Sequence, residues 1–468
     1  MAEMIIPLSE LFESGEASAW EERIFQTACA WGKALAEALL QSWDDKLLEQ
    51  KPAGWRVEGF RERTVMTRFG EVRIRRRLYR DEQGQGRFLL DELLELPPRQ
   101  LAVPVVAEKA IEMASEMGFK KTGEVLASLT GGALSAMSVW RLLEQVGEQA
   151  LAAERVEGEA VYERGERLRQ EGERTPERLF MEADGVWVRL QREEKDWMEI
   201  KVGVAYEGWE AQSYARPGYA LTGKRVYVHG VDNLTFWEGA SLAWSRYWNL
   251  SGIGHFVIGG DGAAWIRGGT RHFPNSVWQL DGFHLARACR RALGKEQGQR
   301  LFQAIREGRW EEAEHIWKTS PKRTKASARK AQRWLTTLLE HHLGEDWRFQ
   351  LHVDADDARG LGAMEGNNAH LIADRMKGKG RSWSRRGALR MAKVRELVLH
   401  QEHRPYCRPA KPHPDAMKVS TQKTEQVRRH RRDTSSWLRA DVPVLHSAAS
   451  QQDWVRRLRL HINGHRLN

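Results

Sequence analysis

The spacing of apolar residues changes several times along the chain, and each change marks a different expected element. Residues 17–50 carry apolar side chains every three or four positions, which predicts an amphipathic helix. Residues 55–80 carry them at every second position, which predicts a β-ribbon that turns at Phe69-Gly70-Glu71 and is basic on its other face. Residues 103–150 return to helical spacing. The N-terminal third is therefore expected to combine helices with one ribbon.

The second helical stretch contains a glycine break. Within 118–147, one expected helix ends before Gly131 and Gly132, and Ser135 stands where it can cap a second helix over 136–146. Two helices joined in this way are the layout of a helix-turn-helix, whose second helix can enter the major groove of DNA. An ordinary helical hairpin fits the same spacing equally.

From residue 178, strand-like stretches alternate with helical ones, which is the pattern of an α/β domain. Strands are expected at 179–190, 197–206, 225–229, 255–260 and 277–280, and a helix at 283–293. Residues 296–350, including the basic run 321–333, are expected to form a wholly helical insertion in this domain. A further helix is expected at 361–376, whereas 154–177 is expected to be a linker or a solvated helix.

These changes divide the chain into seven expected regions. They are an N-terminal helical region (1–54), a basic β-ribbon (55–100), a helical region with the candidate helix-turn-helix (101–153), the first part of the α/β core (178–295), the helical insertion (296–357), the second part of the core (358–403) and a basic C-terminal tail (404–468).

The charge of the chain favours a polyanionic partner. The net charge is +10 and the pI is about 9.5. Residues 375–395 hold nine Lys or Arg and no acid, and residues 404–468 hold fourteen basic and five acidic side chains. The excess is concentrated downstream, as a surface that contacts phosphates would require.

The composition also bounds the compartment. With 41% hydrophobic and 29% charged residues, the 468-residue chain is expected to be globular. No apolar run approaches the roughly 20 residues needed to span a bilayer, and no signal peptide is visible at the start. Three widely separated cysteines form no CxxC motif, which favours a reducing compartment without structural zinc. We therefore expect a cytoplasmic protein without a membrane partner.

Two strand-like segments each place one aspartate before a glycine. These are VIGGDGAAWI (257–266), with Asp261, and MEADGVWVRL (181–190), with Asp184. Asp-Gly is also the commonest signal for a hairpin turn, which is the simpler interpretation of either one alone. Asp184, however, shares a strand face with apolar residues such as Val186, where a carboxylate is costly unless it is paired or bound to a metal. Asp261 follows a short apolar strand, where the ligand sites of open sheets gather.

A third carboxylate is expected from the helix at 361–376. Phosphoryl transfer with two Mg²⁺ ions needs carboxylates from separate parts of the chain that converge within about 4 Å of the metals. On a continuous helix Leu361, Glu365, Ile372 and Met376 share one face. The helix would pack on the sheet by that face and hold Glu365 towards the aspartates. Taken alone, Glu365 also fits an ordinary solvated residue.

Asp281 and His284, in LDGFHLARACRR (280–291), start the helix that follows the last expected strand. Asp281 fits either the second metal ligand, in place of Asp261, or the N-cap of that helix. His284 fits either a group that orients a phosphate or an aspartate, or a structural histidine. No second His or Cys lies at the spacing of zinc ligands.

Six segments together carry a resemblance to a known family. They are RTVMTRFGEVRIRRRLYRD (63–81), FLLDELLEL (88–96), ADGVWV (183–188), GDGAAWI (260–266), LDGFHLARA (280–288) and MEGNNAHLIADRMKGKGRSWSRRG (364–387). In this order they resemble the bacterial insertion-sequence transposases of the ISLre type, which are relatives of the Mutator-like DDE transposases. The similarity is clearest over residues 50–400.

The resemblance implies an α/β fold with a ribonuclease-H-like catalytic domain and an all-helical insertion, preceded by an α+β DNA-binding region. It implies that Asp184, Asp261 and Glu365 are the first, second and third catalytic acids. Asp281 and His284 match the family's C/D-x-x-H signature. Asn368 and Arg375 match polar positions that follow the catalytic glutamate.

The expected function is that of a DDE transposase with two Mg²⁺ (or Mn²⁺) ions held by Asp184, Asp261 and Glu365. Water attacks the phosphodiester at the end of the element, and the freed 3′-hydroxyl then attacks target DNA. The expected partners are the terminal inverted repeats, target DNA and further copies of the chain in a homodimer or larger assembly. The alternatives are a ribonuclease-H-like nuclease that cuts without joining, and a non-transposing DNA-binding protein with an inert α/β body.

Basic residues outside the acidic site are expected to contact DNA. They are Arg68, Arg73 and Arg75 in the ribbon, Lys120, Lys121 and Arg141 in the candidate helix-turn-helix, and Lys377, Lys379, Arg381, Arg385 and Arg386 after the catalytic glutamate. The runs 375–395 and 404–468 are expected to hold the DNA backbone or the target.

Overall fold

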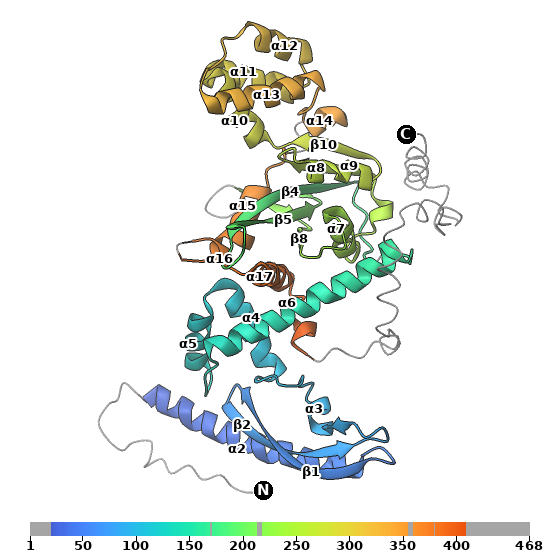
Figure 1. Ribbon diagram of the computed structural model, residues 1–468, viewed down its shortest axis with the longest axis vertical. Helices are drawn as coiled ribbons and strands as arrows, with labels where there is room; N and C mark the ends of the chain where they lie inside the picture. Colours follow the sequence, from blue (N-terminus) through green and yellow to red (C-terminus); the bar gives the residue numbers. More distant parts are fainter. Residues whose placement is uncertain (1–19, 169–170, 213–217, 354–358, 379, 409–468) are drawn as a thin grey trace. The chain divides into compact units, whose positions relative to one another are not determined.

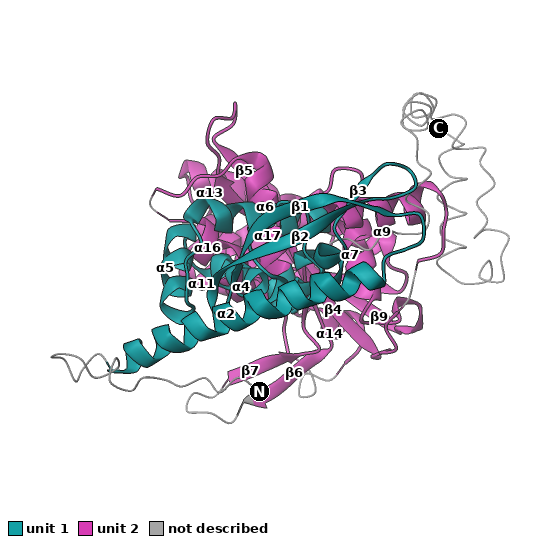
Figure 2. Cartoon of the chain, turned by 90° about the horizontal axis from the view of Figure 1, so that it is seen from below, with its two compact units in different colours: residues 1–150, 397–412 teal, residues 151–396, 413–468 magenta. Residues whose placement is uncertain are grey.

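A computed structural model of the chain describes residues 20–168, 171–212, 218–353, 359–378 and 380–408 (Figure 1). The chain divides into two compact units (Figure 2). Unit 1 comprises Met1–Ala150 with Leu397–Pro412, and unit 2 comprises Leu151–Glu396 with His413–Asn468. Most of the tail expected at 404–468 lies outside the described residues. No helix in the described ranges is long and apolar enough to cross a membrane.

Unit 1 begins with helix α2 (Trp20–Glu49) and the expected ribbon, strands β1 (Arg56–Thr67) and β2 (Gly70–Arg80), which pair antiparallel. A two-residue strand, β3 (Gly86–Arg87), completes the sheet in the order β1-β2-β3. The ribbon turns where the sequence predicted, at Gly70, whose φ is +103°. Alternate residues Val72 and Ile74 of β2 are buried against apolar side chains of α2, so the period-two pattern gives the ribbon one buried face.

Helix α2 also contacts the backbone of β2. The carboxylate of Glu37 accepts a hydrogen bond from the N–H of Arg73 (3.0 Å). Asp44, seven residues further along α2, accepts one from the N–H of Arg77 (3.2 Å). Both acceptors lie on the same side of the helix, since seven residues make about two turns.

Four helices follow the ribbon: α3 (Leu89–Leu93), α4 (Pro104–Glu116), α5 (Phe119–Leu129) and α6 (Ala136–Gly158), whose residues after Ala150 belong to unit 2. Ser135 caps α6 as expected, its hydroxyl accepting a hydrogen bond from the N–H of Ser138 (3.1 Å). The helix runs twelve residues beyond the predicted end at 146, because its apolar stripe continues. The N–H of Gly131, in the turn between α5 and α6, donates to the carbonyl of Arg68 at the ribbon tip (3.1 Å). A Cβ at Gly70 would lie 2.6 Å from the Gly131 carbonyl, so this contact requires glycine.

Unit 2 is built on a five-stranded mixed sheet. Its strands are β4 (Arg178–Arg189), β5 (Trp197–Tyr206), β8 (Arg225–Val228), β9 (His255–Gly260) and β10 (Ser276–Leu280). Their order is β10-β9-β4-β5-β8, with β4, β9 and β10 mutually parallel and β5 antiparallel to both of its neighbours. All five strands lie within a residue of the predicted positions. A separate pair, β6 (Gly208–Gln212) and β7 (Gly218–Thr222), was not predicted.

The two faces of the sheet have different coverings. Leu179, Met181 and Ala183 of β4 point into an aromatic core with Trp237 and Trp244 of α7 (Phe236–Ser245). The alternate residues point to the opposite face, which is contacted by α15 (Met364–Asn368) and by α14 (Trp347–Gln350). The described ranges also contain the short helices η3 (Leu250–Gly252), α8 (Ala264–Arg267), α9 (Gly269–His272) and η6 (Arg404–Cys407).

The expected helical insertion follows β10. Its helices are α10 (Gly282–Leu293), α11 (Lys295–Arg306), α12 (Trp310–Thr319) and α13 (Ala326–Glu340). They enclose a core of their own, which includes Leu285, Leu301, Ile316 and Leu335. Figure 1 shows these helices gathered at the β10 end of the sheet.

The helix predicted at 361–376 differs from the structure in shape. The helical part starts at Met364 in α15, continues as a π-helical segment η5 (Ala369–Ala373) and ends in α16 (Asp374–Met376). The π segment adds a residue to one turn, so a stripe counted on an α-helix is not kept across it. Glu365 is exposed while Ile372 and Met376 are fully buried, so the single face predicted for these three residues is wrong.

Residues 154–177 are not simply a linker. The first of them belong to α6 and to a π-helical segment η2 (Glu159–Glu163), and Glu154 is buried. The carboxylate of Glu154 pairs with the ammonium of Lys393 (2.9 Å), which lies on α17 (Arg385–Leu399). The same ammonium also pairs with Glu396 (2.8 Å). Glu154 further accepts a hydrogen bond from the hydroxyl of Tyr227 (2.6 Å).

This buried cluster balances two carboxylates with one ammonium. Burial by itself would lower the pKa of Lys393, but the charges of Glu154 and Glu396 outweigh it and hold that pKa above its ordinary value. Burial raises the pKa of Glu396, against the effect of the Lys393 charge. The cluster also contacts the sheet, because Glu396 accepts a hydrogen bond from the N–H of Val228 (2.6 Å).

Replacing Lys393 by methionine is expected to destabilise the protein by about 3–5 kcal/mol, because it leaves two buried carboxylates without a cation. Thermal and urea unfolding of the full chain measure the loss. The exposed Lys377 provides the control, since Lys377→Met removes the same charge from solvent. Equal unfolding midpoints for the two variants would contradict the importance of the cluster.

Candidate functional site

Three aspartates lie at the same level across three neighbouring parallel strands. Ala183 of β4 pairs with Gly260 of β9, and Gly260 pairs with Leu280 of β10. The next residue of each segment is an aspartate, namely Asp184, Asp261 and Asp281. Adjacent strands lie about 4.8 Å apart, so the register places the three acids side by side where β9 and β10 end. The N–H of Asp281 still donates to the Gly260 carbonyl (2.7 Å), which continues the ladder to this level.

Asp184 lies within β4 and not in a hairpin turn. The strand continues to Arg189 and remains paired with β5 throughout, so the turn interpretation of this Asp-Gly pair is wrong. One carboxylate oxygen accepts a hydrogen bond from the N–H of Gly185 (2.8 Å), and the other accepts one from the side-chain amide of Asn368 (2.7 Å). Burial, together with the charges of Asp261 and Asp281, raises the pKa of Asp184.

The position of Asp261 agrees with both interpretations of its sequence, a turn and a site at the end of a strand. It directly follows the last residue of β9, and one of its carboxylate oxygens accepts a hydrogen bond from the N–H of Ala263 (2.9 Å). Gly262, between them, has φ of +94°, which a residue with a side chain rarely adopts. A turn therefore fixes the direction in which Asp261 leaves the strand.

Asp281 caps helix α10 and also holds His284. The same carboxylate oxygen accepts a hydrogen bond from the N–H of His284 (2.8 Å) and lies 3.0 Å from the Nδ1 of its ring. Burial by itself would raise the pKa of Asp281, but the contacts with His284 outweigh it and the pKa is lowered. The hydrogen bond to Asp281 raises the pKa of His284, and the charges of Asp184 and Asp261 act in the same direction. His284 therefore tends to carry positive charge beside the three acids.

Helix α15 reaches the row of aspartates through Asn368. Its amide contacts Asp184 directly, and Glu365 lies one helical turn before it, on the segment that packs against β4 and β5. The side chain of Glu365 is exposed. The four acids thus come from elements that contact one another within unit 2.

Arg375 lies further along the same helical segment, in α16. It is buried, with its guanidinium 5.4 Å from the centre of the Trp383 ring. Its carbonyl accepts a hydrogen bond from Arg381 (2.9 Å). Through these contacts Arg375 packs against the segment that follows α16.

The sequence reasoning missed Glu182, two residues before Asp184 on the same face of β4. Glu182 is 3% exposed, and its carboxylate accepts hydrogen bonds from the hydroxyl of Tyr206 (2.6 Å) and from the N–H of Ala363 (3.0 and 3.1 Å). Burial raises its pKa. Because Ala363 directly precedes α15, Glu182 fixes where the helix that carries Glu365 begins. A second acid in an otherwise apolar strand was the available signal.

The donor set at the row suits a divalent cation with a preference for oxygen. Carboxylate oxygens are the ligands that Mg²⁺ and Mn²⁺ take. Burial raises the pKa of Asp184, and the negative charges of Asp261 and Asp281 act in the same direction. In the described part of the chain, no group of three or more His, Cys, Asp or Glu side chains is already arranged around a common metal position. The carboxylates are instead turned towards Gly185, Ala263 and His284.

The candidate DNA-binding cations are mostly exposed. Those at the surface are Arg68, Arg73, Arg75, Lys120, Lys121, Arg141, Lys377, Arg381, Arg385 and Arg386, whereas Lys379 lies outside the described residues. The guanidinium of Arg75 stacks over the ring of Phe60 at 4.3 Å. Lys120 and Lys121 lie 4.0 and 3.6 Å from Glu124, distances at which an exposed pair contributes little.

The expectation that the whole run 375–395 holds DNA is wrong for part of it. Lys393 and Arg395 are buried in α17. Lys393 pairs with two carboxylates, and the guanidinium of Arg395 donates to the carbonyls of His370 and Leu371. Arg381 donates one N–H group to the carbonyls of Asp374, Arg375 and Lys377 and so closes the end of α16. A count of basic residues cannot distinguish such side chains from solvated ones.

Asp281→Asn is expected to lower the pKa of His284 towards its ordinary value of 6.5, because the amide carries no charge. In the wild-type chain the raised pKa means that this contact stabilises the fold below pH 6.5 and that its contribution is lost as the pH rises through the folded-state pKa. NMR titration of ¹³C-labelled histidines, without added metal, measures the shift, and His284→Gln identifies the signal.

The exposed pair His370 and Asp374 (3.3 Å) supplies the control. Asp374→Asn should leave the His284 signal unchanged. An identical His284 titration in wild type and in Asp281→Asn would contradict the assigned electrostatic contact.

Comparison with known proteins places this geometry in one family. The model of an uncharacterised protein family, UPF0236, matches residues 16–408. The chain is 25% identical over 381 residues to UPF0236 protein TTE0402 of Caldanaerobacter subterraneus subsp. tengcongensis, covering 80% of this chain and 72% of that protein. It is also 25% identical over 368 residues to the UPF0236 protein in vanSb 3'region of Streptococcus gallolyticus, covering 76% of each. The match spans both units and all four acids of the site, and the chain belongs to the uncharacterised protein family UPF0236.

Proposed function

We propose that this protein is a DDE transposase that cuts DNA at the ends of an insertion sequence and joins them to target DNA. The observation that carries the proposal is the row formed by Asp184, Asp261 and Asp281, with Asn368 linking it to the helix of Glu365. Phosphoryl transfer with two metal ions requires acids from separate parts of the chain that lie close together. Neighbouring strands of one sheet bring them together here.

A ribonuclease-H-like catalytic domain is the fold that we propose for unit 2. The sheet supports it, because β5 alone runs antiparallel to the four other strands, and the position of the acids along the chain supports it as well. Asp184 comes first on β4 and Asp261 follows β9. Glu365 comes last, after the helical insertion.

Each side chain of the site has a proposed role. Asp184 and Asp261 hold the metals with Glu365, and Asp281 is the alternative to Asp261. Two divalent cations, when bound, activate the attacking water or 3′-hydroxyl and stabilise the leaving oxygen. Asn368 fixes the orientation of the Asp184 carboxylate, as outer partners of metal ligands do.

His284 is suited to orient the scissile phosphate. Its raised pKa favours the imidazolium form, and 44% of its side chain is exposed. It therefore presents a positive charge at the surface, next to the acids. An imidazolium attracts a phosphate oxygen, and the carboxylates fix its position from the other side.

Unit 1 supplies the proposed surface for the element ends. The hydrogen bond between Gly131 and Arg68 joins the ribbon tip to the turn that precedes α6. Arg141, on the second turn of α6, is exposed. A helix-turn-helix and a basic ribbon in contact offer both base-reading and phosphate-contacting groups. Bringing two ends together further requires a dimer or a larger assembly.

The names of the relatives also support a mobile element. One relative in C. subterraneus subsp. tengcongensis carries eleven designations, from TTE0033 to TTE2212, and is 24% identical to this chain over 394 residues. Several copies of a gene in one genome are what an insertion sequence produces when it moves.

Asp184→Asn, Asp261→Asn and Glu365→Gln are each expected to lower both cutting and joining at least about 100-fold, while DNA binding persists. The loss of an outer partner already costs 10–100-fold at metal sites, and the loss of a ligand should cost no less. The assay incubates the protein with Mg²⁺ or Mn²⁺ and DNA that carries the element ends. Asp374→Asn, in the same segment, is the control.

Other outcomes identify the alternative functions. Cutting without joining would indicate a nuclease on the same fold. Binding to DNA with no product in the wild type would indicate a DNA-binding protein with an inert body.

A separate comparison decides the second metal ligand. We expect Asp261→Asn to abolish product and Asp281→Asn to leave part of it, because Asp281 already serves as a helix cap. Product yields from the two variants under identical Mg²⁺ concentrations make the measurement. The reverse order of yields would transfer the role to Asp281.

A further inference from the structure

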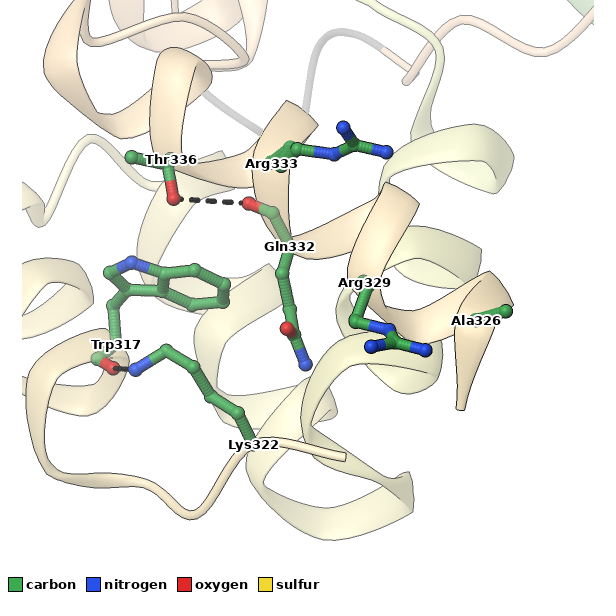
Figure 3. Close-up of a pocket in the computed structure, with 7 residues that line it drawn as sticks. All are labelled: Trp317, Lys322, Ala326, Arg329, Gln332, Arg333 and Thr336. Carbon is green, nitrogen blue, oxygen red and sulfur yellow. Dashed lines mark hydrogen bonds between the residues drawn. The ribbon is translucent and has the colours of Figure 1, made fainter. Parts of the chain in front are cut away.

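The helical insertion of unit 2 contains a hollow of about 620 Å³ (Figure 3). It is lined by Trp317, Lys322, Ala326, Arg329, Gln332, Arg333 and Thr336. These residues come from α12, from α13 and from the connection between them, which belongs to the basic run 321–333. That run holds six Lys or Arg and no acid, and the functional site described above makes no use of it.

The lining carries three cations and no carboxylate. Lys322 is held in place, since its ammonium donates to the carbonyl of Trp317 (2.9 Å) and lies 4.7 Å from the centre of the indole ring. Arg329 and Arg333 lie one turn apart on α13, and both are exposed. Figure 3 shows both guanidinium groups on one side of Gln332, with Trp317 on the other.

The two arginines differ from Arg309 and Lys318, which belong to the same insertion. Arg309 pairs with Glu307 (2.7 Å), and Lys318 pairs with Glu314 (2.7 Å). Within the part of the chain that the structure describes, the side chains of Arg329 and Arg333 form no ion pair. Like charges at this spacing on a helix repel each other, so the arrangement costs stability unless an anion lies between them.

Packing of the insertion does not require these cations. The buried face of α13 consists of Ala328, Ala331, Leu335, Leu338 and Leu339. Arg329 and Arg333 lie outside that face. The first turn of α13 also contains no acidic residue, so the partial positive charge of the helix start adds to the field of the hollow.

We propose that this hollow binds the phosphodiester backbone of DNA, with Arg329 and Arg333 each contacting a phosphate and Lys322 adding charge at the base. The proposal takes DNA as the polyanion from the proposed function. Four residues of α-helix rise about 6 Å, so two phosphates of one strand can be contacted together. Because contacts with phosphates carry no sequence information, this contact is expected to be independent of sequence.

The test is the salt dependence of DNA binding by the full chain, measured by fluorescence anisotropy in EDTA so that no cleavage occurs. For Arg329→Gln/Arg333→Gln, the slope of log K against log salt is expected to be less steep by about 1.8, which corresponds to two lost phosphate contacts. The loss should be the same on duplexes of unrelated sequence. Circular dichroism checks that the helices remain folded.

The matched control is Arg309→Gln/Lys318→Gln, which removes the same charge from the same insertion at positions that carboxylates already neutralise. We expect its slope to equal that of the wild type. Equal slopes for all three proteins would overturn the proposal, and so would an equal reduction in both double variants.

A titration with inorganic pyrophosphate distinguishes binding of the DNA backbone from binding of a small, free phosphate compound. If the arginine variant loses pyrophosphate binding but keeps the wild-type salt slope on DNA, the hollow is a small-anion site and the proposal is wrong. Because no readout involves cutting or joining, its failure is distinguishable from a failure of the transposase proposal.

Discussion

The candidate site depends on the hydrogen-bond register of three parallel strands. Ala183, Gly260 and Leu280 are paired across β4, β9 and β10. The aspartates that follow them in the chain therefore lie side by side. A slip of one residue in β4 would turn Asp184 towards the aromatic core around Trp237, since side chains alternate between the two faces. The buried apolar residues on both faces therefore hold the carboxylates together against their mutual repulsion.

Much of this arrangement could be predicted from local patterns. Alternating apolar residues placed all five strands of unit 2. Asp184 lies inside such a pattern, and Asp261 and Asp281 each directly follow the end of one. Capping chemistry likewise located the start of α6 at Ser135 and the cap of α10 at Asp281. These features depend on neighbours within a few residues, which a single sequence displays. The side-by-side position of the aspartates needed strand order as well, and that was available only by resemblance.

Features that depend on distant partners could not be predicted in this way. Lys393 belongs to a basic run, yet it is buried because Glu154, more than two hundred residues earlier, pairs with it. The stripe assumed for Glu365 failed because the π-helical segment after Asn368 changes the helical repeat. Glu182 accepts its hydrogen bonds from Tyr206 and Ala363, which only the folded chain brings near. In each case the deciding interaction joins segments whose proximity no periodicity encodes.

Carboxylates accept hydrogen bonds from backbone N–H groups of β2 in the three-stranded sheet and of β8 in the five-stranded sheet. Glu37 and Asp44 do so along β2, and Glu396 does so on β8, the last strand of its sheet. A strand with unpaired N–H groups is a template on which another chain can add, and a side-chain acceptor removes that template without adding a strand. Copies of the chain are therefore protected from edge-to-edge aggregation at these places. If copies of the chain assemble through these strands, they must do so by side-chain contacts and not by a β-sheet shared between chains.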